Sequence, residues 1–188
     1  MYASNYKKIV NLSTLSVDIN SSVMKEIAEF SLYSAIAFFM PFMLFGSQFF
    51  LGTIVNMSLI SGALYVKGKK LIPLMMLPSL GVLSRGMMFG PMTIFLVYMI
   101  PFIWIGNFIL IFSVKFFHLK LKKSYSFSSV LGSGLKFAFL FSSALVLYVI
   151  GAIPVSFLII MGLIQLVTAV SASIAVFPIN KIRKKLKK

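Results

Sequence analysis

Cysteine and acidic residues are what this sequence has least of. It contains no cysteine and three acids, Asp18, Glu26 and Glu29, all of which precede Phe30. The absence of cysteine excludes disulfides, thiol catalysis and thiolate metal sites. The absence of later carboxylates argues against a proton relay or a metal-dependent hydrolytic site inside any downstream segment.

Other signatures of catalysis are missing as well. The single histidine, His118, lies in a basic stretch, and no serine shares a membrane depth with it. The sequence also lacks the glycine-rich phosphate-binding loop that ATP hydrolysis by that route requires. We therefore expect a protein that is not an enzyme and that uses neither a metal nor a cofactor.

Apolar residues are what the sequence has in abundance. Of its 188 residues 60% are hydrophobic and 11% are charged, and the mean hydropathy is +1.01. A soluble domain of this length cannot hide so much apolar surface from water, so the surrounding solvent is predicted to be lipid. We expect one membrane domain, in the cell membrane, with lipid as a partner.

The formal net charge of +15 raises the possibility of a nucleic-acid-binding protein, but the position of the cations argues against it. Sixteen of the 18 cations fall at the chain ends or between apolar stretches. Cations clustered there are typical of the cytoplasmic side of a membrane protein, where they also contact anionic lipid headgroups. The four clusters are Lys7/Lys8/Lys25, Lys67/Lys69/Lys70, Lys115/Lys120/Lys122/Lys123 and Lys181/Arg183/Lys184/Lys185/Lys187/Lys188.

Six apolar segments are long enough to be candidate spans, which predicts an all-α, six-helix membrane bundle. Both termini and alternate connections are basic, whereas the remaining connections carry one cation, Arg85. Both termini are therefore expected in the cytoplasm. We expect a cytoplasmic extension at 1–25, with room for a short surface helix, a membrane domain at 26–180 and a basic tail at 181–188. The candidate spans are 29–45, 48–66, 71–85, 91–117, 127–151 and 154–178, and prolines at 73 and 78 are expected to break the third.

Four polar side chains are predicted to share one depth near the middle of the membrane. At about 1.5 Å of rise per residue, Asn56, Asn107, Lys136 and Gln165 each lie roughly 12–17 Å from a boundary. A lysine at that depth costs at least ~2.5–3.5 kcal/mol unless it reaches the surface or finds partners. Lys136 must therefore snorkel, bind amides and carbonyls, or hold a bound anion, because Glu26 and Glu29 lie about half a bilayer away.

Each of these residues also has a simpler interpretation. Asn56 and Gln165 can serve only as hydrogen-bonded bridges between helices, and Arg85 can be an interfacial anchor. Trp104 can be an ordinary aromatic of the membrane boundary, but it lies three residues before Asn107 and shares its helix face. The common depth favours a joint binding site, with Trp104 as an apolar wall.

Small residues predict where the helices approach one another. Ser129, Gly132 and Ser133 share a helix face with Lys136, and Gly162, Ala169 and Ser173 share one with Gln165. Such stripes favour close helix packing and direct both polar side chains into the bundle. Ser31 and Ala35 form a weaker pair of this kind in the first segment, after Ala28.

Four stretches of the sequence together match a known pattern. They are GSQFFLGTIVNMSLISGALYVKGKKLIPLMMLPSLGVLSRGMMFGP, MIPFIWIGNFILI, LGSGLKFAFLF and GLIQLVTAVSASIAVF. In these stretches the sequence resembles the substrate-binding subunits of energy-coupling factor (ECF) transporters, in an uncharacterised branch. The resemblance covers about 26–178 and includes Asn56, Pro101, Asn107, Lys136 and Gln165.

The resemblance implies a six-helix bundle that captures a vitamin or other micronutrient near the extracytoplasmic side. It also implies a transmembrane coupling subunit and two ATPase subunits as partners, with small residues of the first helix, here Ser31 and Ala35, at the coupling contact. We expect Asn107 and Lys136 to anchor a small polar, anionic substrate. Gln165 and Asn56 would be secondary contacts, and Arg85 would attract substrate at the outer mouth.

Two other functions remain open from the sequence. The polar layer of a structural or assembly membrane protein could serve only to fix helix register. A stand-alone channel or facilitator would move its substrate without an ATPase. The identity of the substrate is not readable from the residues, since carboxylate, phosphate and neutral vitamins all fit.

Overall fold

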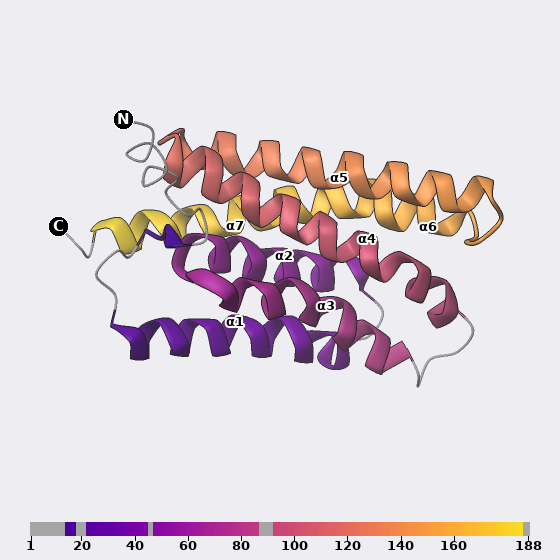
Figure 1. The fold of residues 1–188 in the computed structure, drawn as a ribbon, viewed down its shortest axis with the longest axis horizontal. Coiled ribbons are helices and arrows are strands. Elements are labelled where there is room, and N and C mark those ends of the chain that lie inside the picture. The colour runs from indigo at the N-terminus through magenta and orange to yellow at the C-terminus, as the bar shows by residue number, and fades with distance from the viewer. Residues whose placement is uncertain (1–13, 18–21, 45–46, 87–91, 186–188) are drawn as a thin grey trace, which may run out of the picture.

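A computed structural model describes residues 14–17, 22–44, 47–86 and 92–185 of the chain, and no strand occurs in them. The rest of the expected extension and the last three residues of the expected tail lie outside the described residues. The elements, shown in Figure 1, are α1 (Val23–Met43), α2 (Gln48–Tyr65), η3 (Gly68–Lys70), α3 (Leu71–Gly86), α4 (Met92–Ser113), η4 (Val114–Lys120), α5 (Tyr125–Val149), α6 (Ser156–Ile159), η5 (Ile160–Ile164) and α7 (Gln165–Lys185).

These elements form helical rods that run back and forth along one axis (Figure 1). The short segment η3 leads directly into α3, and the π-helical segment η4 continues α4. Because α6, η5 and α7 also follow one another without a break, six rods result from the ten described elements. Five of the rods are long and apolar enough to cross a membrane. The sixth, α3, has 16 residues. The all-helical membrane fold expected from the sequence is confirmed.

Serine side chains begin three of the rods. The hydroxyl oxygens of Ser22, Ser47 and Ser124 each accept a hydrogen bond from the backbone N–H three residues later, at 3.3, 3.4 and 3.2 Å. Each bond satisfies one of the N–H groups that a helix start leaves without a partner. Gly151, with φ +77°, forms the turn after α5, where a residue with a Cβ would be strained.

The expectation that prolines break the third segment is wrong. Helix α3 runs from Leu71 to Gly86 with Pro78 buried inside it, and Pro73 lies in its first turn. A first-turn proline removes an N–H that has no intrahelical partner in any case. An interior proline is tolerated in membrane helices because neighbouring groups satisfy the carbonyls that it frees. Interior prolines also occur in α1, α4 and α7.

The cations gather at one end of the bundle, which we call the basic end. It carries residues 67–70, 115–123 and 181–185, and the described ends of the chain lie there as well (Figure 1). The last residues of α1, α3 and α5 and the first residues of α2, α4 and α6 lie at the opposite end, which we call the Arg85 end (Figure 1). The charge segregation expected from the sequence is therefore present in three dimensions.

Ion pairs connect the rods at the basic end. The carboxylate of Glu26 lies 3.2 Å from Lys70 Nζ, and that of Glu29 lies 2.8 Å from Arg183. The Arg183 guanidinium also stacks over the ring of Tyr65, at 4.1 Å from its centroid. These contacts explain why α7 continues to Lys185, into the segment expected to be a basic tail. They also place both glutamates far from Lys136, as expected.

Buried apolar side chains form two separate clusters. The cluster toward the basic end draws on α1, α2, α3, α4, η4, α5 and α7, and includes Leu59, Leu64, Leu110, Val114 and Val176. The cluster toward the Arg85 end draws on α4, α5 and the α6–η5 rod with its preceding turn, and none of its described members comes from α1, α2 or α3. Among the described residues, the two halves of the bundle, α1–α3 and α4–α7, therefore share a core cluster only at the basic end.

Apolar side chains also cover the outside of the bundle. Phe39, Ile94, Val146 and Ile174 lie within helices and are 57%, 62%, 62% and 68% exposed. A water-soluble monomer rarely exposes so extensive an apolar surface, whereas a helix that faces acyl chains does so by necessity. The surface and the helix lengths together are those of a multi-pass membrane protein.

Candidate functional site

Three of the predicted polar residues meet inside the bundle. Lys136, on α5, is 3% exposed, and its Nζ donates hydrogen bonds to Asn56 Oδ1 on α2 at 2.7 Å and to Asn107 Oδ1 on α4 at 2.9 Å. Both asparagines are 1% exposed. The lysine therefore does not snorkel, and two amide oxygens solvate its amine.

The outer side of each amide is also bound. Asn56 Nδ2 donates to Thr168 Oγ1 on α7 at 3.2 Å, and Asn107 Nδ2 donates to the Met75 carbonyl on α3 at 2.8 Å. Because a lysine amine can only donate, both amides must present their oxygens to it and their NH₂ groups away from it. One network thus connects α2, α3, α4, α5 and α7.

The Met75 carbonyl lies next to the carbonyl that a proline leaves without its usual donor. Pro78 has no N–H to bind the Leu74 carbonyl, so one hydrogen bond of the helix is missing at this point. In membrane helices, groups from neighbouring helices bind the backbone around such a proline. This arrangement answers why Asn107 stands in an otherwise apolar helix: it links α3 to Lys136.

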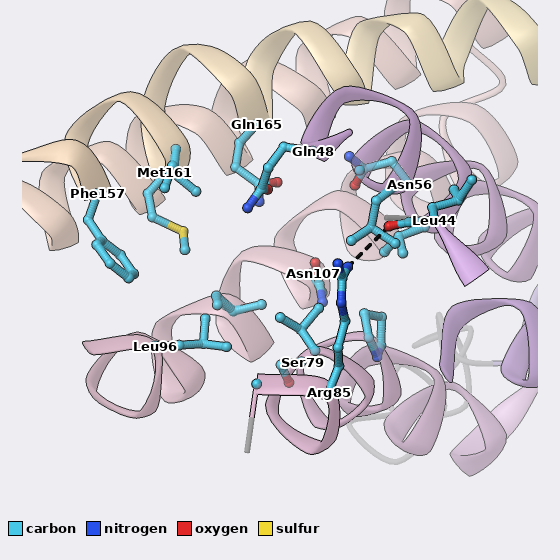
Figure 2. A pocket seen from close by; sticks show the side chains of 18 of the residues that line it. Leu44, Gln48, Asn56, Ser79, Arg85, Leu96, Asn107, Phe157, Met161 and Gln165 are labelled. Atoms are coloured by element: carbon cyan, nitrogen blue, oxygen red, sulfur yellow. Dashed lines mark hydrogen bonds between the residues drawn. The ribbon is translucent and has the colours of Figure 1, made fainter. Parts of the chain in front are cut away.

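A cavity of about 500 Å³ lies next to this network, between the two halves of the bundle. Its lining residues lie between the middle of the rods and the Arg85 end, where the described residues of α1–α3 share no core cluster with the rods opposite. Asn56, Asn107 and Lys136 form its floor. Figure 2 shows the labelled side chains converging on this space from α2, α3, α4 and the α6–α7 rod.

Arg85 lines the same cavity near its other end. Its Nη1 donates to the Leu44 carbonyl at the end of α1 at 3.1 Å, as the dashed line in Figure 2 shows. Arg85 lies ten residues after Met75 on α3, which corresponds to about 15 Å of helix rise above the floor. The lining residues therefore include two cationic side chains and no carboxylate.

Gln165 lies on the cavity wall rather than in the lysine network. It is one turn from Thr168, whose hydroxyl donates to the Gln165 backbone carbonyl at 3.2 Å. Its side chain makes no hydrogen bond with the described residues and points into the cavity, as does that of Gln48 (Figure 2). Two amide ends are thus available to a ligand on this wall.

Sequence reasoning missed several polar residues of the cavity. Gln48 and Ser156 lie at the Arg85 ends of their rods, where a polar residue normally faces the membrane boundary. The Ser156 hydroxyl is buried and has no hydrogen-bond partner within the described residues. No pattern in the sequence distinguishes such a residue from an ordinary helix-end serine, because the direction of its side chain depends on the packing.

Trp104 lies beside the cavity and is not one of its lining residues. Its Nε1 donates to Ser79 Oγ on α3 at 2.6 Å, and Ser79 does line the cavity. The apolar part of the wall, expected at Trp104, comes from other residues. They are Leu51, Val55, Val82, Leu96, Ile103, Phe157, Ile160 and Met161.

The small-residue stripes occupy two different environments. Ser129 and Ser133 on α5 and Ala169 on α7 are fully buried, and Ser133 Oγ lies 3.5 Å from Ser173 Oγ. The stripes on α5 and α7 thus lie at helix contacts, as expected. Ser31 and Ala35 instead lie on the exposed face of α1, together with Ala28.

Comparison with known proteins gives no evidence about function. No family model matches the chain, and no curated protein or solved structure is significantly similar to it.

Proposed function

We propose that this protein is the substrate-capture subunit of an ATP-driven importer of the ECF type, and that it binds a small polar, anionic vitamin or micronutrient. The observation that carries the proposal is the buried Lys136, held by two amides at the floor of a cavity without carboxylates. A lysine amine has three donors. Asn56 and Asn107 take two, which leaves one for a ligand oxygen.

The cavity has the character of a ligand site. A ligand pocket is a concavity of about 300–1,000 Å³ with mostly apolar walls and a few convergent polar groups, and this cavity of about 500 Å³ fits that description. Inside a membrane protein the local dielectric constant is low, so an anion gains more from a cation there than it would in water. An ionisable residue at this depth is by default a candidate for function.

The closed basic end supports capture rather than conduction. Between the cavity floor and the basic end, the rods are sealed by the apolar cluster that contains Leu64, Leu110 and Val114. A bound anion would have to pass this apolar cluster to leave on the other side, so its release would require the rods to move. The proposed coupling and ATPase subunits would supply the energy for that movement, with Ser31 and Ala35 on the exposed face of α1 as the proposed contact.

The charge distribution supports a cytoplasmic position for the basic end and both termini. In that orientation the cavity faces the extracytoplasmic side of the cell membrane. Substrate would enter past Arg85, which would attract anions at the mouth through its charge.

Native mass spectrometry of the gently extracted protein tests the anchor. Wild type should carry a bound small molecule, and Lys136→Met should lose it while the bundle stays folded. Lys120→Met, at the exposed basic end, is the matched control and should keep it. An equal mass at equal occupancy in Lys136→Met would show that Lys136 is not the anchor.

Two further measurements separate this proposal from the other functions. Extraction without any small molecule or coupling subunit would favour a structural protein whose polar layer only fixes helix register. Uptake into proteoliposomes that contain this protein and no ATPase would favour a stand-alone facilitator. The proposal expects a bound molecule and no such uptake.

A further inference from the structure

The cavity presents positive charge at both ends and apolar side chains between them. Lys136 lies on the floor, and Arg85 lies about 15 Å of helix rise away. Leu51, Val55 and Ile103 lie on the wall between these levels. The two charges are thus separated along the bundle axis by an apolar stretch.

The cavity lining that the structure describes contains no acid. Glu26 and Glu29 pair with Lys70 and Arg183 at the basic end, and the sequence contains no acid after Glu29. A charge in a low-dielectric site is stabilised by an opposite charge far more than by dipoles alone. A ligand with one anionic group can compensate one end of the cavity, whereas a ligand with two can compensate both.

The Arg85 end also provides polar groups for a second anionic group. The buried Ser156 hydroxyl has no partner among the described residues, and the Gln48 amide points into the cavity (Figure 2). A hydroxyl and an amide NH₂ both donate to a carboxylate or phosphate oxygen. An anionic group at this end would therefore find neutral donors in addition to the guanidinium charge.

Building on the proposed function, we propose that the substrate is an elongated molecule with an anionic group at each end. One group binds Lys136 between Asn56 and Asn107, and the other binds at the level of Arg85 and Ser156. The segment between them is largely hydrocarbon and lies against the apolar wall. Gln48 and Gln165 hydrogen-bond polar atoms along that segment.

Calorimetric titration of the purified protein with a series of α,ω-dicarboxylates, from succinate to sebacate, tests this inference. The matched control for each diacid is its own monomethyl ester, which has the same length and one charge fewer. Wild type should show an optimum chain length, at which the diacid binds at least tenfold more tightly than its ester. An ω-phosphonocarboxylate of that length distinguishes a phosphate-like end from a carboxylate.

Arg85→Met should reduce the affinity for the best diacid at least tenfold, to the level of its ester, and should leave the affinity for the ester within twofold. Lys120→Met should change neither affinity. The inference is overturned if no diacid binds more tightly than its ester, or if Arg85→Met weakens both equally. The proposed function survives that result as long as native mass spectrometry still finds a bound molecule that depends on Lys136, and it fails without one.

Discussion

Asn107 and Lys136 show how single residues set the chemistry of the site. Lysine donates and never accepts, so each of the two amides facing it is fixed in one orientation. Moving a charged lysine from water into the middle of the membrane costs roughly several kcal/mol of free energy. Hydrogen bonds that involve a charge return about 1.5–3 kcal/mol each. The asparagines therefore make the buried amine tolerable without neutralising it.

Asn107→Asp keeps an oxygen atom beside Lys136 but adds a negative charge, so it tests whether the positive charge of Lys136 is needed for anion binding. The new carboxylate would lie at the position of Oδ1, 2.9 Å from Lys136 Nζ, and would occupy the positive charge that we assign to the substrate. We expect anion binding to fall at least about tenfold, since an ion pair at this distance is worth more than ~1.4 kcal/mol at low dielectric. The carboxylate also loses the Nδ2 donor to the Met75 carbonyl, and this loss opposes the gain from the ion pair, so the melting temperature should fall less than in Asn107→Leu. Titration and thermal unfolding in the same detergent measure both quantities.

Asn107→Leu is the companion variant. It removes one acceptor from Lys136 and the side-chain donor to the Met75 carbonyl. It should lower the free energy of unfolding by about 1–3 kcal/mol. If Asn107→Asp binds the anion as tightly as the wild type does, the charge of Lys136 is not what binds the anion.

Part of the site can be predicted from the sequence by calculating the depth of each residue in the membrane from its distance along the helix. Helix rise is nearly constant, so residue numbers are sufficient to place Asn56, Asn107 and Lys136 at one level. The rotation of each helix about its axis is less constant, and it depends on packing. For this reason the sequence predicts Trp104 on the cavity wall, whereas its indole lies against Ser79. Nothing in the sequence marks Thr168 or the Met75 carbonyl as part of the site, because their roles come only from the asparagines that contact them in the folded bundle.

At the scale of elements, irregular turns direct the side chains of the last rod. The π-helical segment η5 ends immediately before Gln165, and Ile160, Met161 and Gln165 all line the cavity. A π-helical turn contains an additional residue and changes the register of the helix after it. A uniform helical period, as applied to Gly162, Gln165 and Ala169, cannot represent this change. Interior prolines mislead a sequence-based prediction for a related reason, because neighbouring helices satisfy the carbonyls that they free.

Helices α1 and α3 are held in close contact at a glycine. A Cβ built on Gly81 would lie 2.4 Å from the backbone carbonyl oxygen of Phe38, and backbone cannot move aside as a flexible side chain can. We expect Gly81→Ala to push the two helices apart and to lower the free energy of unfolding by about 1–3 kcal/mol, as overpacked core substitutions do. Thermal or denaturant unfolding in detergent measures the change.

Gly134→Ala is the matched control for this prediction. Gly134 is also inside a helix, α5, and a Cβ there meets nothing within 4 Å. Alanine should leave stability unchanged or raise it by about 0.5–1 kcal/mol, because glycine costs that much in a helix interior. Equal effects of the two substitutions would contradict the close contact between α1 and α3.

At the scale of the whole molecule, the two ends of the bundle differ in kind. The basic end is closed by a shared apolar cluster and by ion pairs from α1 to η3 and α7. The segment 14–17 adds to this closure, because the Val17 N–H donates to the Leu64 carbonyl at 2.8 Å and Lys115 Nζ donates to the Leu15 carbonyl. The Arg85 end instead contains the cavity. The proposed substrate would reach the site from the Arg85 end, so the orientation of the bundle decides whether the protein can serve import.

Cysteine labelling determines that orientation, and the natural absence of cysteine makes every single-cysteine variant specific. Lys123 lies at the basic end and Val155 lies at the Arg85 end, and both side chains are exposed. The positive-inside rule predicts that Val155→Cys reacts with a membrane-impermeant maleimide in intact cells. Lys123→Cys should react only after permeabilisation. The reverse pattern would place the cavity on the cytoplasmic side, where capture of an external substrate is impossible, and would make import the wrong direction for this bundle.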